Sequence, residues 1–156
     1  SMASRELGAR DVGGLHRASL AAAIPAFGIG AAFSVAYLLV GEPFVAVLTS
    51  LPDVTDAALV VLPIVAIVPI ASAGAYLFDG VFLGTGRVTW MLASMTVSAA
   101  VFFAVWWLGS GVEGADARNA NLWIAFTVFN VMRGLTLGAA YWHLTRRRAW
   151  LETAHA

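Results

Sequence analysis

Long runs of apolar residues, separated by short polar segments, dominate the chain. Four of these runs are long enough to cross a bilayer, because a membrane-spanning helix needs about 20 mainly apolar residues. They cover residues 18–41, 57–86, 88–112 and 119–145. A fifth run, 43–52, is too short to span and is expected to form an interfacial turn. The pattern predicts an all-α integral membrane protein whose four transmembrane helices occupy residues 18–145.

The composition supports a location in a membrane. Of the 156 residues, 60% are hydrophobic and 12% are charged, whereas soluble domains have about 45–50% and about 25%. The formal net charge is zero and every basic residue is Arg, so no basic excess indicates a nucleic-acid partner. Cysteine is absent, which excludes disulfides, thiolate metal sites and cysteine nucleophiles.

The charges between the apolar runs predict an orientation. Arg residues gather in segment 1–17, at Arg87 and in segment 146–156, whereas acidic residues dominate segments 41–56 and 113–118. Because basic flanks of membrane helices stay in the cytoplasm, we expect both termini to be cytoplasmic. The chain then has a cytoplasmic N-terminal segment, four spans and a basic cytoplasmic tail, in the inner (plasma) membrane of a bacterium.

Two residues of formal charge, Asp79 and Arg133, lie well inside predicted spans. Helical rise places Asp79 about 10 Å and Arg133 about 18 Å from the cytoplasmic ends of their spans. An ionisable residue at membrane depth is expensive and normally has a partner, and Arg can reach several ångströms along a helix. We therefore expect a contact between the two. It is either a structural pair that holds two helices together or a site that handles a proton or cation.

Polar side chains accompany both charges at helical spacing. Ser72 and Tyr76 share a face with Asp79, and Thr127 and Asn130 share a face with Arg133. Two readings remain open for these four residues. They line a hydrated cavity between the helices, or they form hydrogen bonds that hold helices together.

Each charge is followed directly by two glycines spaced four residues apart. Gly80 and Gly84 follow Asp79, and Gly134 and Gly138 follow Arg133. Such spacing lets helix backbones approach closely. We expect these four glycines to serve in helix packing.

The sequence contains no arrangement typical of an enzyme. No nucleophile lies near a base in a recognisable motif, and the three histidines lack metal-ligand spacing. We therefore predict a protein that is not an enzyme and has no cofactor and no bound metal, apart from H⁺ or Na⁺ as a coupling ion.

Four stretches occur in a recognisable order. They are the charged segment 5–17, LVGEP at 39–43 with the apolar run that follows, LFDGVFLGTGR at 77–87, and the segment 122–137 from LWIAF to RGLTL. Together they resemble the C-terminal part of a MATE-type (multidrug and toxic compound extrusion) transporter, closest to the DinF-like branch. The resemblance covers most of residues 4–148.

This resemblance implies a fold and a function. Members of the family have about twelve helices in two lobes, and this chain resembles helices nine to twelve, part of the C-terminal lobe. They export amphipathic, often cationic compounds in exchange for H⁺ or Na⁺. Asp79 occupies the position of an acidic residue on the tenth helix that takes part in cation handling. The first expectation is therefore a MATE-like transporter fragment or subunit.

Two alternatives remain. The chain is a non-transporting membrane scaffold or interaction protein with a degenerate transporter fold, or it is a small four-helix exporter that acts as a homodimer. For partners we expect the lipid bilayer, a small amphipathic substrate, and either a parallel second copy or a complementary transporter polypeptide. A homodimer interface is expected to include at least one of the two glycine pairs.

Overall fold

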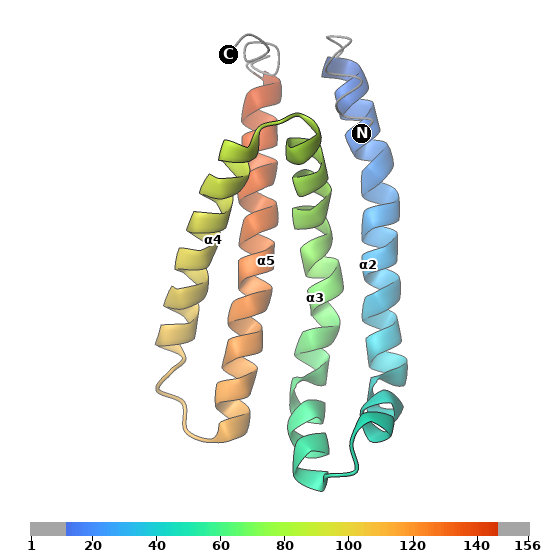
Figure 1. Cartoon of the computed structure of the whole chain (residues 1–156), viewed down its shortest axis with the longest axis vertical. Coiled ribbons are helices and arrows are strands. Elements are labelled where there is room, and N and C mark those ends of the chain that lie inside the picture. The colour runs from blue at the N-terminus through green and yellow to red at the C-terminus, as the bar shows by residue number, and fades with distance from the viewer. Residues whose placement is uncertain (1–11, 147–156) are drawn as a thin grey trace.

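Four long helices make up the described chain (Figure 1). A computed structural model describes residues 12–146, so most of the expected N-terminal segment 1–17 and basic tail 146–156 lies outside the described residues. The helices are α2 (Val12–Leu48), α3 (Pro52–Gly84), α4 (Val88–Leu108) and α5 (Ala115–Arg146). All four are long and apolar enough to cross a membrane, which confirms the predicted number of spans.

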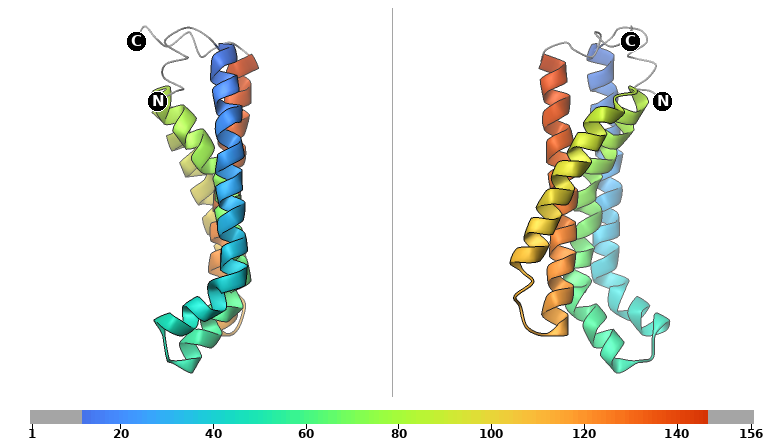
Figure 2. Two further views of the ribbon diagram at one scale, coloured as in Figure 1. Left: turned by 90° about the vertical axis from the view of Figure 1, so that its right-hand side faces the viewer. Right: turned by 60° about the vertical axis from the view of Figure 1, so that its left-hand side comes forward.

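The helices stand side by side in the order α2, α3, α5, α4 (Figure 1). α3 packs along both α2 and α5, and α5 also packs along α4, whereas α3 and α4 touch little although a short turn joins them. When the layer is viewed edge-on, the helices overlap, and α4 is tilted relative to α2 (Figure 2). Each helix therefore turns large apolar side chains outward, as lipid or further helices require.

The observed helices are longer than the predicted spans at several ends. α2 runs on to Leu48, so most of the segment 43–52, expected to form an interfacial turn, is helical, and residues 49–51 connect α2 to α3. Pro43 lies inside α2 because a proline removes only one backbone hydrogen bond and the helix can bend there. Figure 2 shows the last turns of α2 and the first turns of α3 bending away together.

Small residues set the distance between the helices. A Cβ on Gly30 of α2 would lie 2.9 Å from the Pro69 carbonyl oxygen of α3. A Cβ on Gly134 of α5 would lie 3.3 Å from the backbone nitrogen of Ala75. Both flanking helices therefore approach the backbone of α3 closely, as expected where small residues replace bulky ones.

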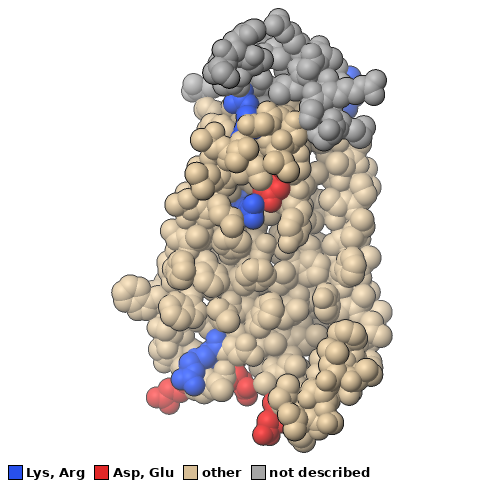
Figure 3. Space-filling view, viewed as in Figure 1, with Lys and Arg blue, Asp and Glu red and all other residues tan. Residues whose placement is uncertain are grey.

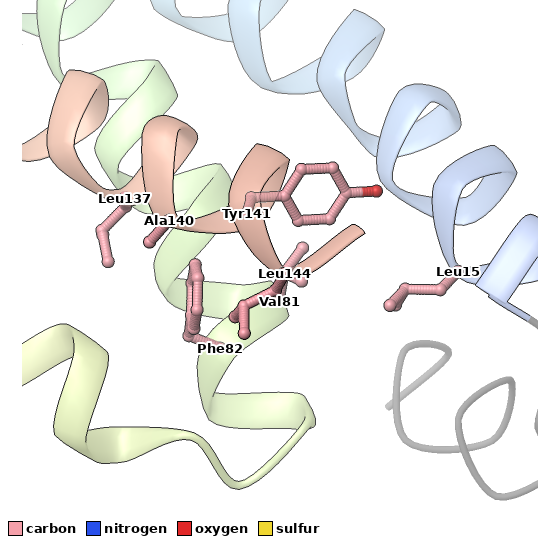
Figure 4. Close-up of a cluster of buried hydrophobic side chains, with 7 residues drawn as sticks. All are labelled: Leu15, Val81, Phe82, Leu137, Ala140, Tyr141 and Leu144. Carbon is pink, nitrogen blue, oxygen red and sulfur yellow. The ribbon is translucent and has the colours of Figure 1, made fainter. Parts of the chain in front are cut away.

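A cluster of buried apolar side chains joins α2, α3 and α5 near the end that carries Val12 and Arg146 (Figure 4). The Tyr141 ring of α5 points toward α2 and lies 5.6 Å from the Phe78 ring. The Tyr141 hydroxyl is 3.2 Å from Nδ1 of His16. The buried members of the cluster are Leu15, Val81, Phe82, Leu137, Ala140, Tyr141 and Leu144. This packing fixes α3 against α5 beside the residue Asp79.

Charged side chains separate to the two ends of the layer. Among the described residues, Arg17, Arg87 and Arg146 lie at the end of the layer where α2 begins and α5 ends. The opposite end is mainly acidic (Figure 3). Its charged residues are Glu42, Asp53, Asp56, Glu113, Asp116 and Arg118. A pair of opposite charges also appears within the uncharged middle of the surface, well away from the acidic end.

Candidate functional site

That pair is Asp79 of α3 and Arg133 of α5. The Arg133 Nη2 donates to Asp79 Oδ1 at 3.0 Å and lies 2.9 Å from Oδ2. Each side chain is 19% exposed, so the pair is largely buried but open to one face of the layer. The structure brings together the two ionisable residues that the sequence places inside spans.

The close approach of α3 and α5 explains why the two charges meet. Gly134, next to Arg133, lies against the backbone of Gly74 and Ala75, and Gly138 lies one turn further along against the Phe78 ring. Larger side chains at these two positions would push α5 away from α3. Arg133 then could not hold Asp79 at hydrogen-bond distance.

The guanidinium of Arg133 contacts the carboxylate of Asp79 through one nitrogen. Nη2 alone contacts both oxygens of Asp79. Nε of Arg133 is buried and has no hydrogen-bond partner among the described residues. An unmet buried donor costs about 1–3 kcal/mol, more when charged. The resting pair therefore leaves part of the donor capacity of Arg133 unused.

The backbone around Arg133 is held by a contact that sequence reasoning did not assign to the site. The hydroxyls of Ser94 on α4 and Thr136 on α5 are 2.6 Å apart, and Ser94 Oγ lies 3.4 Å from the Arg133 carbonyl oxygen. Thr136 lies three residues after Arg133, so helical spacing could have placed it on the same face of α5 as Arg133. One turn along α4, Ser98 is fully buried and its hydroxyl has no partner among the described residues.

The four residues proposed to line a cavity differ in their exposure. Tyr76 is 68% exposed, whereas Ser72 and Asn130 are buried. Ser72, Thr127 and Asn130 each donate a hydrogen bond to a carbonyl of their own helix, four residues earlier. Such bonds satisfy one donor of each side chain within its own helix.

The hollows on the described surface include two apolar ones, and none of the four cavity candidates lines either of these two. One, of about 220 Å³, runs along α2, and the other, of about 270 Å³, lies between α4 and the start of α5. The first is lined by Phe33, Ala36, Tyr37, Val40, Gly41 and Phe44, and the second by Phe102, Leu122, Trp123 and Phe126.

The two glycine pairs have different surroundings. Gly134 and Gly138 face α3 within the chain, which agrees with a packing role. Gly80 is exposed, and a Cβ there would meet no atom within 4 Å. The described neighbours therefore give no packing reason for glycine at position 80, and this side of α3 remains available to lipid or to another helix.

Comparison with known proteins places the chain among its relatives. Residues 1–108 match the MatE family. The chain belongs to this family. It is 40% identical, over 122 residues, to the DNA damage-inducible protein F of Escherichia coli (strain K12). The match covers 76% of this chain and 25% of that protein, so the chain spans about a quarter of the length of its relative. No solved structure matches the chain.

Membership of the MatE family confirms the resemblance predicted from the four sequence stretches. With four helices able to cross a membrane, the chain is a multi-pass membrane protein. The family consists of transporters rather than enzymes. Asp79 lies within the part of the chain that matches the family, and Arg133 lies beyond it.

Proposed function

We propose that this MatE chain is a fragment or subunit of a secondary transporter that exports amphipathic, often cationic compounds in exchange for H⁺ or Na⁺. The observation that carries the proposal is the Asp79–Arg133 pair inside two helices of spanning length. Ionisable residues at membrane depth are costly, and in membrane proteins they mark ion pathways and proton relays.

In the proposed mechanism, Asp79 alternates between Arg133 and the transported charges. A proton or Na⁺ on Asp79 removes the attraction that holds the Arg133 guanidinium 2.9 Å away. The cost of leaving Arg133 unpaired in apolar surroundings then favours a different arrangement of α3 and α5. A cationic substrate at Asp79 has the same effect, so ion and substrate compete for one carboxylate.

The distribution of charge supports a proposed orientation. The described end with Arg17, Arg87 and Arg146 would face the cytoplasm, in accordance with the rule for basic flanks. Asp79 then lies nearer the cytoplasmic side of the inner membrane of a bacterium. Exchange at Asp79 would begin from that side.

The proposed transporter needs more helices than the described chain provides. Its relative is about three times as long, and a single layer of helices encloses no path across a membrane. We propose that the exposed face of α3 around Gly80 meets either a parallel second copy or a complementary transporter polypeptide. Gly80 allows the close helix approach that drives association in lipid.

Proteoliposomes that contain the full chain test the transport proposal. Release of a fluorescent organic cation is followed after a pH gradient or a Na⁺ gradient is imposed. We expect gradient-driven release by the unmodified chain and loss of release in Asp79→Asn. The matched control is Asp56→Asn, which makes the same change at an exposed position of the same helix and should leave release unchanged.

The same measurement decides between the proposal and its alternative. Equal release by Asp79→Asn and the unmodified chain contradicts a coupling role for Asp79. Absence of gradient-driven release from the chain, both alone and together with the remaining helices of a MatE protein, favours the non-transporting scaffold.

A further inference from the structure

We propose that the Asp79–Arg133 pair binds a dipolar ligand, whose nitrogen cation replaces Arg133 at Asp79 and whose oxyanion replaces Asp79 at Arg133. The inference deepens the proposed function by naming the charge type of the ligand, and it rests on the proposal that this site handles the transported compound. It is tested by binding rather than by transport.

The charge balance of the pair favours such a ligand. Asp79 and Arg133 are each 19% exposed, and each is the other's ion-pair partner. A ligand with a single positive charge would occupy Asp79 and leave Arg133 without a partner in apolar surroundings, which is strongly unfavourable. A ligand that carries both charges leaves neither protein group unpaired. A dipolar ligand is therefore expected to bind more tightly than a cation that displaces Arg133 from Asp79 alone.

The geometry of Arg133 favours an oxyanion as the second group. Asp79 uses Nη2 only, and Nε has no partner among the described residues. A carboxylate or phosphate prefers two parallel bonds from the planar guanidinium. A ligand oxyanion that turns the guanidinium side-on would use Nε together with Nη2. The ligand would thus satisfy a donor that the resting pair leaves unsatisfied.

The surroundings of the pair favour a ligand with an apolar body. Figure 3 shows the two charges at the surface on one face of the layer, with uncharged side chains around them. On α3, Tyr76 lies one turn before Asp79 and is 68% exposed, and Leu83 lies one turn after it and is 66% exposed. Between them, Gly80 adds no side chain. An apolar group can therefore lie along α3, between this helix and the further helix proposed to meet the same face, while the charged groups reach the pair.

Two sources supply this chemistry. One is a free amphipathic zwitterion, and the other is the ammonium–phosphate headgroup of phosphatidylethanolamine. Asp79 precedes Gly84, the last residue of α3, by about 8 Å along the helix. Both a headgroup and a soluble ligand can therefore reach it from the nearer end of the layer.

Titration of the purified full chain in detergent with three matched aromatic ligands tests the inference. The ligands are phenylalanine, which carries both charges, 2-phenylethylamine, which is a cation, and 3-phenylpropionate, which is an anion. We expect phenylalanine to bind at least about tenfold more tightly than the other two, a difference of about 1.4 kcal/mol. The double variant Asp79→Asn/Arg133→Gln should lose this preference. The charge-exchanged variant Asp79→Arg/Arg133→Asp should keep it, which controls for the fold.

A second arm identifies a lipid source. The chain is placed in bilayers of equal phosphatidylethanolamine and phosphatidylglycerol, extracted, and its retained lipid measured by mass spectrometry. Retention of phosphatidylethanolamine by the unmodified and charge-exchanged chains, but not by the double variant, indicates the headgroup. The inference is overturned if neither arm shows a preference for the dipolar ligand, or if a preference persists in the double variant. Cation release that depends on Asp79 would still support the transport proposal in that case.

Discussion

The Asp79–Arg133 pair makes a quantitative prediction for stability. In Asp79→Asn the guanidinium of Arg133 keeps its charge but loses its ion-pair partner. In Arg133→Gln the carboxylate of Asp79 likewise keeps its charge and loses its partner. Each single change therefore removes an attraction and also leaves an unpaired charge in a largely buried place. The double change removes both charges together and leaves two neutral amide side chains.

The magnitude follows from the contact distance and the exposure. With nitrogen and oxygen 2.9 Å apart, the charge centres lie about 4 Å apart, which corresponds to about 4 kcal/mol at an effective dielectric constant of about 20. The 19% exposure of each side chain and the reach of Arg toward the interface reduce this value. We expect each single change to cost about 2–4 kcal/mol. The double change should cost less than the sum of the two by about 2 kcal/mol or more.

Reversible unfolding of the detergent-solubilised chain by increasing mole fractions of a denaturing detergent measures these free energies. Asp56→Asn and Arg118→Gln make the same chemical changes at exposed positions of α3 and α5, and should each cost less than about 0.5 kcal/mol. If the losses of the two single changes at the pair add to within about 0.5 kcal/mol, the residues are energetically independent and the reasoning is refuted.

Three further predictions concern helix packing, association and orientation. Gly30→Val should lower the midpoint of thermal unfolding clearly, because a Cβ there would lie 2.9 Å from the Pro69 carbonyl oxygen. As a control, Gly28→Val should have little effect, because a Cβ at position 28 meets nothing within 4 Å. Equal effects of the two changes would contradict the close contact between α2 and α3. Gly80→Leu should weaken self-association, measured by mass in mild detergent, without loss of thermal stability; unchanged mass would exclude this face of α3 from the interface. A cysteine at Gly114 should react with an impermeant thiol reagent from outside the cell, and reaction from the inside only would reverse the proposed orientation.

The sequence predicted the number of helices and the contact between the two buried charges. Both predictions depend on the bilayer, which sets the length of an apolar run and penalises a lone ionisable group. The sequence predicted the ends of the helices less accurately. α2 continues through Pro43 to Leu48, since one missing hydrogen bond does not end a helix that is otherwise favoured.

Sequence periodicity also did not show which neighbour a residue meets. Spacing placed Ser72 and Tyr76 on one broad face with Asp79, yet Ser72 is buried and Tyr76 is exposed. The hydroxyl of Ser72 bonds to its own helix, an option that the spacing of polar residues does not reveal. Likewise, the glycine pairs look alike in sequence, but Gly134 faces α3 and Gly80 faces outward. The spacing of the glycines indicates that a helix can approach closely, but the packing of all four helices decides which side of the helix has a neighbour.

Displacement of the coupling ion by substrate tests the central claim, that Asp79 is the carboxylate at which ion and substrate exchange. Purified chain in weakly buffered detergent is mixed with an organic cation, and released H⁺ is followed with a pH-sensitive dye while released Na⁺ is followed with a radioactive tracer. If Asp79 has this role, one of these ions is released from the unmodified chain and from Asp56→Asn, and neither is released from Asp79→Asn. Equal release from Asp79→Asn and the unmodified chain would contradict this role.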